Sequence, residues 1–395
     1  PPMSRPLRHL ALLLALTSGV AAVAAAQVPF DTPPKRPKMS AEADTNSALA
    51  YFNYGMGRMA VDPLGAAAAF YWASRLDPSW ALPLYAERTA LLLARPPGDL
   101  KTYLVKRREG QDNPDLQRID SLALRALIKN PFVDRRLDGI LISTWLSRET
   151  GDQTTLRDLG SYDRYFTAWS AYLRGDYPMA MKVFGELVKR YPKDPDLRFW
   201  RALTQFSKGQ LDSARMELQS SVSLERATEV ELPGYGWISH SWAEYAVGLL
   251  FSLTGQADSA RTAYERALLD DVRLHSAHYQ LGKVRLAARD TAGAIAEYQQ
   301  AAALAPDDAT YLADLGVLLI VRGAADSGIA VLNRAVAAEP FFPTPHFSLG
   351  LVYEQAGLKT EAAQHFESFI ALAPQNMGPA IAAAKRHLAA IKGGD

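Results

Sequence analysis

Cysteine is absent from all 395 residues. Its absence excludes disulfides, thiolate metal sites, a cysteine nucleophile and the lipid-modified cysteine of a bacterial lipoprotein. The chain also lacks an excess of charge of either sign, because 43 Lys and Arg residues balance 42 Asp and Glu residues to a formal net charge of +1. This balance does not favour nucleic acid as a partner, and we expect none.

Signatures of catalysis and of cofactor binding are missing as well. The sequence contains no G-x-S-x-G, H-E-x-x-H, G-x-x-x-x-G-K or G-x-G-x-x-G. We therefore predict no enzyme activity and no cofactor. The weaker alternative is an enzyme whose site lies in 45–160, a region without histidine that would have to use carboxylates.

Histidines offer the nearest approach to a metal site. His275 and His278 are one helical turn apart and share one helical face, and His346 lies further along the chain. A metal ion needs a third ligand, and no carboxylate evidently converges on these positions. We favour packing or surface roles for these histidines and predict no metal site.

Long apolar runs are lacking except at the N-terminus. From Met3 the chain starts with two arginines, continues through the apolar run Leu10–Val23 and reaches the small residues Ala24–Ala26. This order is typical of a secretory signal peptide over residues 1–26, with Gln27 as the new N-terminus. We expect the prolines at positions 1 and 2 to be an artefact ahead of the natural start.

An uncleaved N-terminal membrane anchor is the alternative interpretation of that run, although the run is short for a span of roughly 20 apolar residues. We expect export to a bacterial periplasm or envelope, with membrane attachment only through an uncleaved N-terminus. The proline-rich, polar residues 27–44 predict a disordered tether.

Helical patterns dominate after the tether, and the chain shows no convincing alternating strand. A glycine or loop residue recurs at one constant interval between two helical stretches; these residues are Gly255, Arg289, Gly323 and Gly357, and further upstream Gly175 and Gly209 keep the same interval. Small residues and large apolar residues recur in step with them, and His346 follows His278 after two such intervals. A fixed period in this range indicates a solenoid of stacked units.

The segment Leu349 to Pro374 shows the pattern of one unit: LG-x2-Y, then Gly, then A-x3-F, then Pro. This pattern resembles the tetratricopeptide repeat, which has the same period. The resemblance covers two units in 161–225 and four units in 241–374. It implies an all-α fold, a right-handed superhelical solenoid of antiparallel helix pairs, and a role in binding proteins or peptides.

The rest of the chain departs from the repeat pattern. Residues 45–160 have helical composition without a clear register, and we predict divergent helical hairpins there. Residues 226–240 form an inserted loop between two units, and residues 375–395 suit a C-terminal capping helix with a short tail.

Aromatic residues on the first helix of each unit give the candidate site. Those not used for packing within a pair should face the concave side of the solenoid, where they could hold a peptide or protein segment. The predicted binding residues are Tyr165, Trp169, Tyr172, Phe206, Trp242, Tyr245 and Tyr279, with Trp237 from the inserted loop. The last two units offer Phe347, Val317 and Ile320 instead.

The same aromatic side chains would also suit packing between neighbouring units, and the sequence leaves both roles open. It also leaves open whether the groove is empty or filled by the N-terminal helices. We interpret the chain as a non-catalytic protein–protein interaction scaffold; the alternative is a membrane-anchored assembly factor that retains its N-terminal hydrophobic segment. No motif identifies the partner or the oligomeric state.

Overall fold

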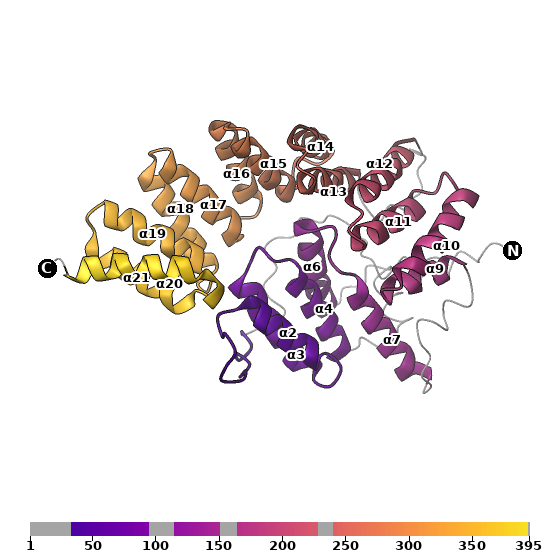
Figure 1. Ribbon diagram of the computed structural model, residues 1–395, viewed down its shortest axis with the longest axis horizontal. Helices are drawn as coiled ribbons and strands as arrows, with labels where there is room; N and C mark the ends of the chain where they lie inside the picture. Colours follow the sequence, from indigo (N-terminus) through magenta and orange to yellow (C-terminus); the bar gives the residue numbers. More distant parts are fainter. Residues whose placement is uncertain (1–32, 95–113, 151–163, 228–239, 394–395) are drawn as a thin grey trace. The chain divides into compact units, whose positions relative to one another are not determined.

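The computed structural model describes residues 33–94, 114–150, 164–227 and 240–393. It divides into two compact units, and the division falls within one helix of the repeats. Among the described residues, unit 1 comprises 84–280, whereas unit 2 combines 33–83 with 281–393. Every regular element in the described ranges is a helix, which confirms the all-α prediction (Figure 1). The predicted signal segment, 1–26, lies outside these ranges.

The repeats form antiparallel helix pairs in both units. Unit 1 contains α9 (Arg164–Leu173) with α10 (Tyr177–Arg190), α11 (Pro195–Ser207) with α12 (Leu211–Ala227), and α13 (His240–Leu253) with α14 (Ala257–Asp270). The helix α15 (His275–Ala287) crosses the division, and unit 2 continues with α16 (Thr291–Leu304), α17 (Ala309–Val321), α18 (Ala325–Ala338), α19 (Pro343–Gln355) and α20 (Lys359–Leu372). A 3-10 turn (Gln375–Met377) and the last helix α21 (Gly378–Gly393) follow. The predicted helical solenoid is confirmed.

Small residues allow the two helices of a pair to approach closely. A Cβ atom on Gly350 of α19 would lie 2.7 Å from Cε1 of Phe366 on α20, and one on Gly248 of α13 would lie 2.4 Å from Cε1 of Tyr264 on α14. Both aromatic rings are fully buried. The recurring glycine and the recurring aromatic residue are therefore two halves of one contact, because the ring fills the space that the missing side chain leaves.

The turns inside the pairs require a left-handed backbone conformation. Gly323 has φ +86° and Gly357 has φ +76°, values that glycine adopts without steric cost. Arg289 occupies the same place between α15 and α16, and it has φ +64°. It is the one non-glycine residue with positive φ in the part of the chain that the structure describes.

Replacing Arg289 by glycine should stabilise the α15–α16 pair by about 0.5–1 kcal/mol. An L-residue in this conformation costs about 1–2 kcal/mol, and the greater entropy of glycine in the unfolded chain offsets part of that gain. Urea unfolding of the full chain measures the change. The matched control, Gly323→Ala, should shift stability by about 1 kcal/mol in the opposite direction, and equal signs for the two variants would contradict the argument.

The helices before the repeats belong to both units. Unit 2 contains α2 (Ala48–Arg58) and α3 (Pro63–Leu76), which form a hairpin, whereas α4 (Leu82–Ala94), α6 (Pro114–Lys129) and α7 (Arg136–Thr150) precede the repeats of unit 1. None of the described helices is long and apolar enough to cross a membrane.

A buried ionic cluster joins α4 to α6 and α7. Arg88 is fully buried, and its Nη1 donates to Oδ1 of Asp138 at 2.8 Å while its Nε lies 3.9 Å from Oδ1 of Asp120. The hydroxyl of Tyr85 donates to the other carboxylate oxygen of Asp138 at 2.6 Å. Burial, followed by the nearby Asp138 carboxylate, raises the pKa of Tyr85, so this hydroxyl stays a donor.

Candidate functional site

Most of the predicted aromatic residues lie in the core of unit 1. Tyr165, Trp169, Tyr172 and Tyr245 are buried, and Phe206, Trp242 and Tyr279 are half-buried. Trp237 lies outside the described residues. The structure thus places the described members of this aromatic set on α9, α11, α13 and α15, as predicted, with four of the seven buried.

The C-terminal end of α6 lies against α13. The indole Nε1 of Trp242 donates to the carbonyl oxygen of Leu127 at 3.2 Å. The hydroxyl of Tyr245 donates to the backbone carbonyl oxygen of Lys129 at 3.1 Å. The last carbonyls of a helix have no partner within the helix. Trp242 and Tyr245 supply those partners, and the chain's own helix therefore receives the hydrogen bonds that a bound peptide would use.

The turn between α6 and α7 completes this contact. Phe132 stacks on Phe206 of α11, with ring centroids 4.2 Å apart and an interplanar angle of 18°. The guanidinium of Arg135 lies 5.9 Å from the ring centroids of Phe199 and Trp200 on the same helix. Of the two roles that the sequence left open for these aromatic residues, the described geometry favours intramolecular packing in unit 1.

Sequence reasoning placed residues 129–132 among the divergent helical hairpins of 45–160 and did not assign them a partner. The signal was present in the aromatic residue Phe132 directly after Pro131, at a turn where a large apolar side chain needs a surface to cover it. Its partner Phe206 lies two helix pairs further along the chain, and only the folded chain shows the pairing.

The histidines of the repeats pack within and between helices. Nε2 of His278 lies 3.0 Å from the carbonyl oxygen of Val272, and Nδ1 of His346 lies 3.1 Å from Nδ1 of His365 on α20. His365 in turn stacks on Tyr353, with ring centroids 5.5 Å apart. In the part of the chain that is described, no three His, Asp or Glu residues converge in a way that could hold a metal ion.

His346 makes the last repeat sensitive to acid. Burial, and then the neighbouring His365, lowers the pKa of His346 from 6.5 to about 4. Between pH 6.5 and 4, His346 therefore binds a proton in the unfolded chain but not in the folded chain. The free energy of unfolding falls as the pH drops through this window.

We expect wild type to lose about 1–2 kcal/mol between pH 7 and pH 4.5 from this residue. His346→Phe keeps a large ring at the position and should lose less over the same range. Urea unfolding at the two pH values, followed by hydrogen exchange in α19 and α20, measures the difference. An identical pH dependence in both proteins would contradict the assignment to His346.

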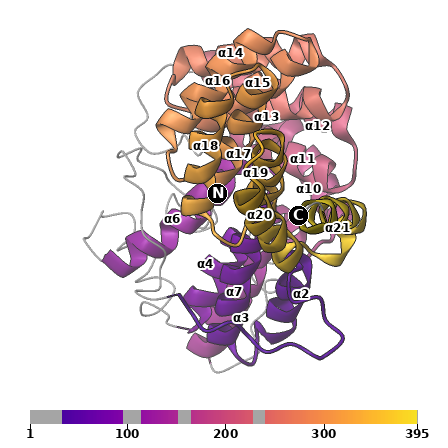
Figure 2. The ribbon, with the colours of Figure 1, turned by 90° about the vertical axis from the view of Figure 1, so that its left-hand side faces the viewer.

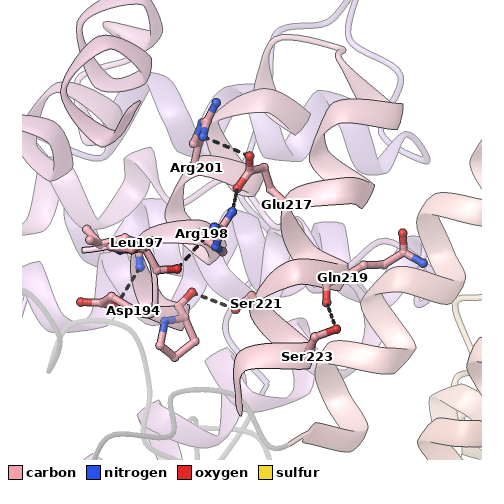
Figure 3. A network of polar contacts seen from close by, with 10 residues as sticks. Asp194, Leu197, Arg198, Arg201, Glu217, Gln219, Ser221 and Ser223 are labelled. Atoms are coloured by element: carbon pink, nitrogen blue, oxygen red, sulfur yellow. Dashed lines mark hydrogen bonds and ion pairs between the residues drawn. The ribbon is translucent and has the colours of Figure 1, made fainter. Parts of the chain in front are cut away.

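A polar network joins α11 to α12 beside a surface cavity (Figure 3). Glu217 of α12 accepts hydrogen bonds or ion pairs from Arg198 at 3.3 Å and from Arg201 at 3.1 Å. The cavity has a volume of about 500 Å³, and its lining residues are Arg198, Met216, Gln219, Ser220, Ser223 and Leu224.

The hydroxyl groups in this network are occupied by the backbone. Ser221 donates to the carbonyl oxygen of Pro195 at 2.8 Å, and Ser223 donates to that of Gln219 at 2.9 Å. In both bonds the acceptor is a backbone carbonyl oxygen, which is not a base that would activate a serine as a nucleophile. The arrangement holds two helices together and offers no evident nucleophile.

The first helices of the pairs in unit 2 expose several apolar side chains. We call these four residues the aliphatic row: Leu286 of α15, Val317 and Val321 of α17, and Leu351 of α19. Val321 is 74% exposed and the others 37–38%. Val317 and Leu351 are one repeat period apart, so they occupy equivalent places in successive pairs.

Of the three residues that the sequence offered for the last two units, Val317 belongs to the aliphatic row. Ile320 and Phe347 are only partly exposed, and they pack against the buried clusters of α18 to α21. The aliphatic row itself was partly missed because sequence reasoning weighted aromatic residues above aliphatic ones.

A family model described as Tetratricopeptide repeat matches residues 167–222, 248–309, 279–343 and 313–376. Over these residues the chain is similar to the tetratricopeptide repeat. The matched residues contain helix pairs from both units, and they bear out the resemblance seen in the sequence. Tetratricopeptide repeats support a role as a protein-interaction scaffold.

Several solved tetratricopeptide and related structures are similar to this chain. A crystal structure of the MamA protein is 18% identical, with a TM-score of 0.38, and the match covers 47% of this chain and 90% of that one. YrrB, described as a TPR protein with an unusual peptide-binding site, is 17% identical, with a TM-score of 0.41 and coverage of 51% and 97%.

The C-terminal part of a TPR repeat-containing protein from Cytophaga hutchinsonii is 16% identical, with a TM-score of 0.45 and coverage of 58% and 84%. No curated protein matches the chain.

Proposed function

We propose that this protein is a non-catalytic interaction scaffold that binds an extended peptide segment of another protein, rich in aliphatic side chains, along the aliphatic row of unit 2. The observation that carries the proposal is the repetition of exposed apolar side chains on α15, α17 and α19. Unit 1 is the less suitable surface, since α6 and the turn after it already contact its aromatic residues.

Physical reasons favour an extended aliphatic ligand. Apolar area removed from water contributes roughly 25 cal/mol per Å², so several half-exposed side chains in succession favour a ligand that covers all of them. An extended segment that crosses α15, α17 and α19 buries apolar area against each of these helices, whereas a compact ligand buries area against one. The scaffold needs no cofactor, and nucleic acid is not its partner, because the chain carries no basic excess.

Peptide selection on the intact chain tests this function. A displayed library of random extended peptides should yield aliphatic sequences, and their affinity, measured by fluorescence polarisation, should fall at least tenfold in Val317→Glu and in Leu351→Glu. The matched control is Leu269→Glu, a change at an 85% exposed position of α14 outside the row. Selected peptides that bind the row variants and the control equally well would overturn the proposal.

We also propose that the protein is exported to a bacterial periplasm or envelope. The cationic start and the apolar run of residues 3–26 support this. N-terminal sequencing of the mature protein separates the two forms of the proposal. Gln27 as first residue would indicate a free scaffold, and retention of the apolar run would indicate the membrane-anchored assembly factor.

A further inference from the structure

The hairpin of α2 and α3 contacts the last repeats of its own unit. Trp72 of α3 meets Phe341, in the loop between α18 and α19, with ring centroids 4.9 Å apart and an interplanar angle of 76°. One turn further along α3, Arg75 forms an ion pair with Glu339 at the end of α18, and its guanidinium lies 5.8 Å from the ring centroid of Phe341. An aromatic residue and an arginine of one helix thus contact one inter-repeat loop together.

A second contact lies at the end of α20, which in an antiparallel pair lies at the same end as the start of α19. The side-chain amide of Asn46 donates to the carbonyl oxygen of Ala371 in α20 at 2.7 Å. The carboxylate of Asp44 accepts from the backbone N–H of Gln375, just after α20, also at 2.7 Å. The hairpin and the residues before it therefore contact the α19–α20 pair at the end where α19 begins and α20 stops. Figure 2 shows α2, α3, α19 and α20.

The residues before α2 hold Trp72 in place. The indole Nε1 of Trp72 donates to the carbonyl oxygen of Pro34 at 2.9 Å. The guanidinium of Arg36 lies 5.2 Å from the ring centroid of Trp72 and 5.3 Å from that of Tyr51. Displacement of Pro34 and Arg36 would remove a hydrogen bond and a cation–π contact from Trp72, and the state of this segment is thereby linked to the contact with the repeat.

Two apolar clusters of the last repeats contain no residue of the hairpin. The cluster around Phe366 and Phe369 and the cluster around Leu332 and Leu349 draw all their members from α17 to α21 and the turn before α21. The described contacts with the hairpin include an ion pair, an aromatic pair, a cation–π contact and a few hydrogen bonds. Such a contact can open without unfolding the repeat that it touches.

The ion pair stabilises the contact. Glu339 is only 6% exposed, and its carboxylate is stabilised there by Arg75 and by the backbone N–H of Phe341, which donates to it at 3.2 Å. Burial raises the pKa of Glu339 to about 7, and Arg75 opposes that rise. Without Arg75 the carboxyl of Glu339 either takes up a proton or regains water when the hairpin moves away, and an added negative charge at position 75 favours the second outcome.

We propose that the α2–α3 hairpin is a reversible latch on the last repeat, closed by Trp72 and Arg75 and released when the segment carrying Pro34 and Arg36 is pulled away or bound elsewhere. The latch connects events at the N-terminal side of the chain to the geometry of α19 and α20. It does not depend on the identity of a ligand for the aliphatic row.

Spin labels on the full chain test the latch. The absence of native cysteine allows labels at two introduced cysteines, Val61→Cys, at an 82% exposed position between α2 and α3, and Leu358→Cys, at a 44% exposed position between α19 and α20. Pulsed dipolar EPR should give one narrow distance distribution for this background. Arg75→Glu, which sets two carboxylates against each other, should broaden it and move it to longer distances.

Two further variants make the result decisive. Arg75→Glu combined with Glu339→Arg restores opposite charges and should return the narrow distribution. Arg58→Glu is the matched control, because it makes the same charge change on the same hairpin at a side chain that is 47% exposed and pairs with Asp62. An unchanged distribution in Arg75→Glu, or equal broadening in Arg58→Glu, would overturn the latch; hydrogen exchange in α19 and α20 shows whether the repeat is still folded.

Discussion

Replacing Asp138 by alanine is expected to destabilise unit 1 by about 3–5 kcal/mol. The change removes from Arg88, which is fully buried, the carboxylate that accepts from its Nη1 at 2.8 Å. The arginine guanidinium does not lose its proton in proteins, so the buried charge persists. The hydroxyl of Tyr85 loses its acceptor at the same time. Urea unfolding, with hydrogen exchange in α4 and α7 to locate the change, measures the effect.

A nearby surface pair is the control. Arg136 pairs with Asp134 at 2.6 Å, but the two side chains are 54% and 34% exposed, and Arg136→Ala should cost less than about 1 kcal/mol. The double variant Arg88→Met with Asp138→Leu replaces the buried charges by apolar groups and should be more stable than Asp138→Ala alone. If Asp138→Ala costs no more than Arg136→Ala, the cluster does not hold α4 to α7.

Replacing Phe366 by alanine should cost about 3–5 kcal/mol in unit 2. The ring is fully buried, fills the space beside Gly350 and stacks on His387 of α21 at 5.3 Å between ring centroids. Its removal empties the contact between α19 and α20 and also the contact of the last helix. We therefore expect hydrogen exchange in α21 to lose its protection together with that in α20, although the substitution lies in α20.

Leu351→Ala on α19 is the matched control for this prediction. Its side chain is 38% exposed, and truncation should change stability by no more than about 0.5 kcal/mol. The same comparison separates folding from binding, because Leu351 belongs to the aliphatic row. Continued protection of α21 in Phe366→Ala would show that the last helix packs without this ring.

The aromatic residues of unit 1 and the aliphatic row of unit 2 differ in what contacts them. In unit 1 the hydrogen-bond donors Trp242 and Tyr245 are bonded to the end of α6, whereas in unit 2 the equivalent helices turn valine and leucine side chains to solvent. A single repeat pattern therefore serves two purposes, and aromatic content alone does not mark the surface that is available to a partner.

The sequence by itself determined the repeated part of the fold. Gly350 and Phe366, or Gly248 and Tyr264, lie on adjacent helices joined by a short turn, so each contact is local and its spacing is the same in every repeat. The glycine at the turn follows from the same local requirement for positive φ. A pattern of short-range contacts can be read directly because every unit repeats it.

Only the tertiary structure decided what covers each face. Phe132 on Phe206, Lys129 beside Tyr245 and Arg75 on Glu339 each join residues that are separated in the sequence by several helices. Each of these residues is equally compatible with solvent or with another partner when judged by its neighbours in the chain. Burial is a property of the whole packed molecule, and long-range pairs without a repeating spacing leave no periodic signal from which it could be predicted.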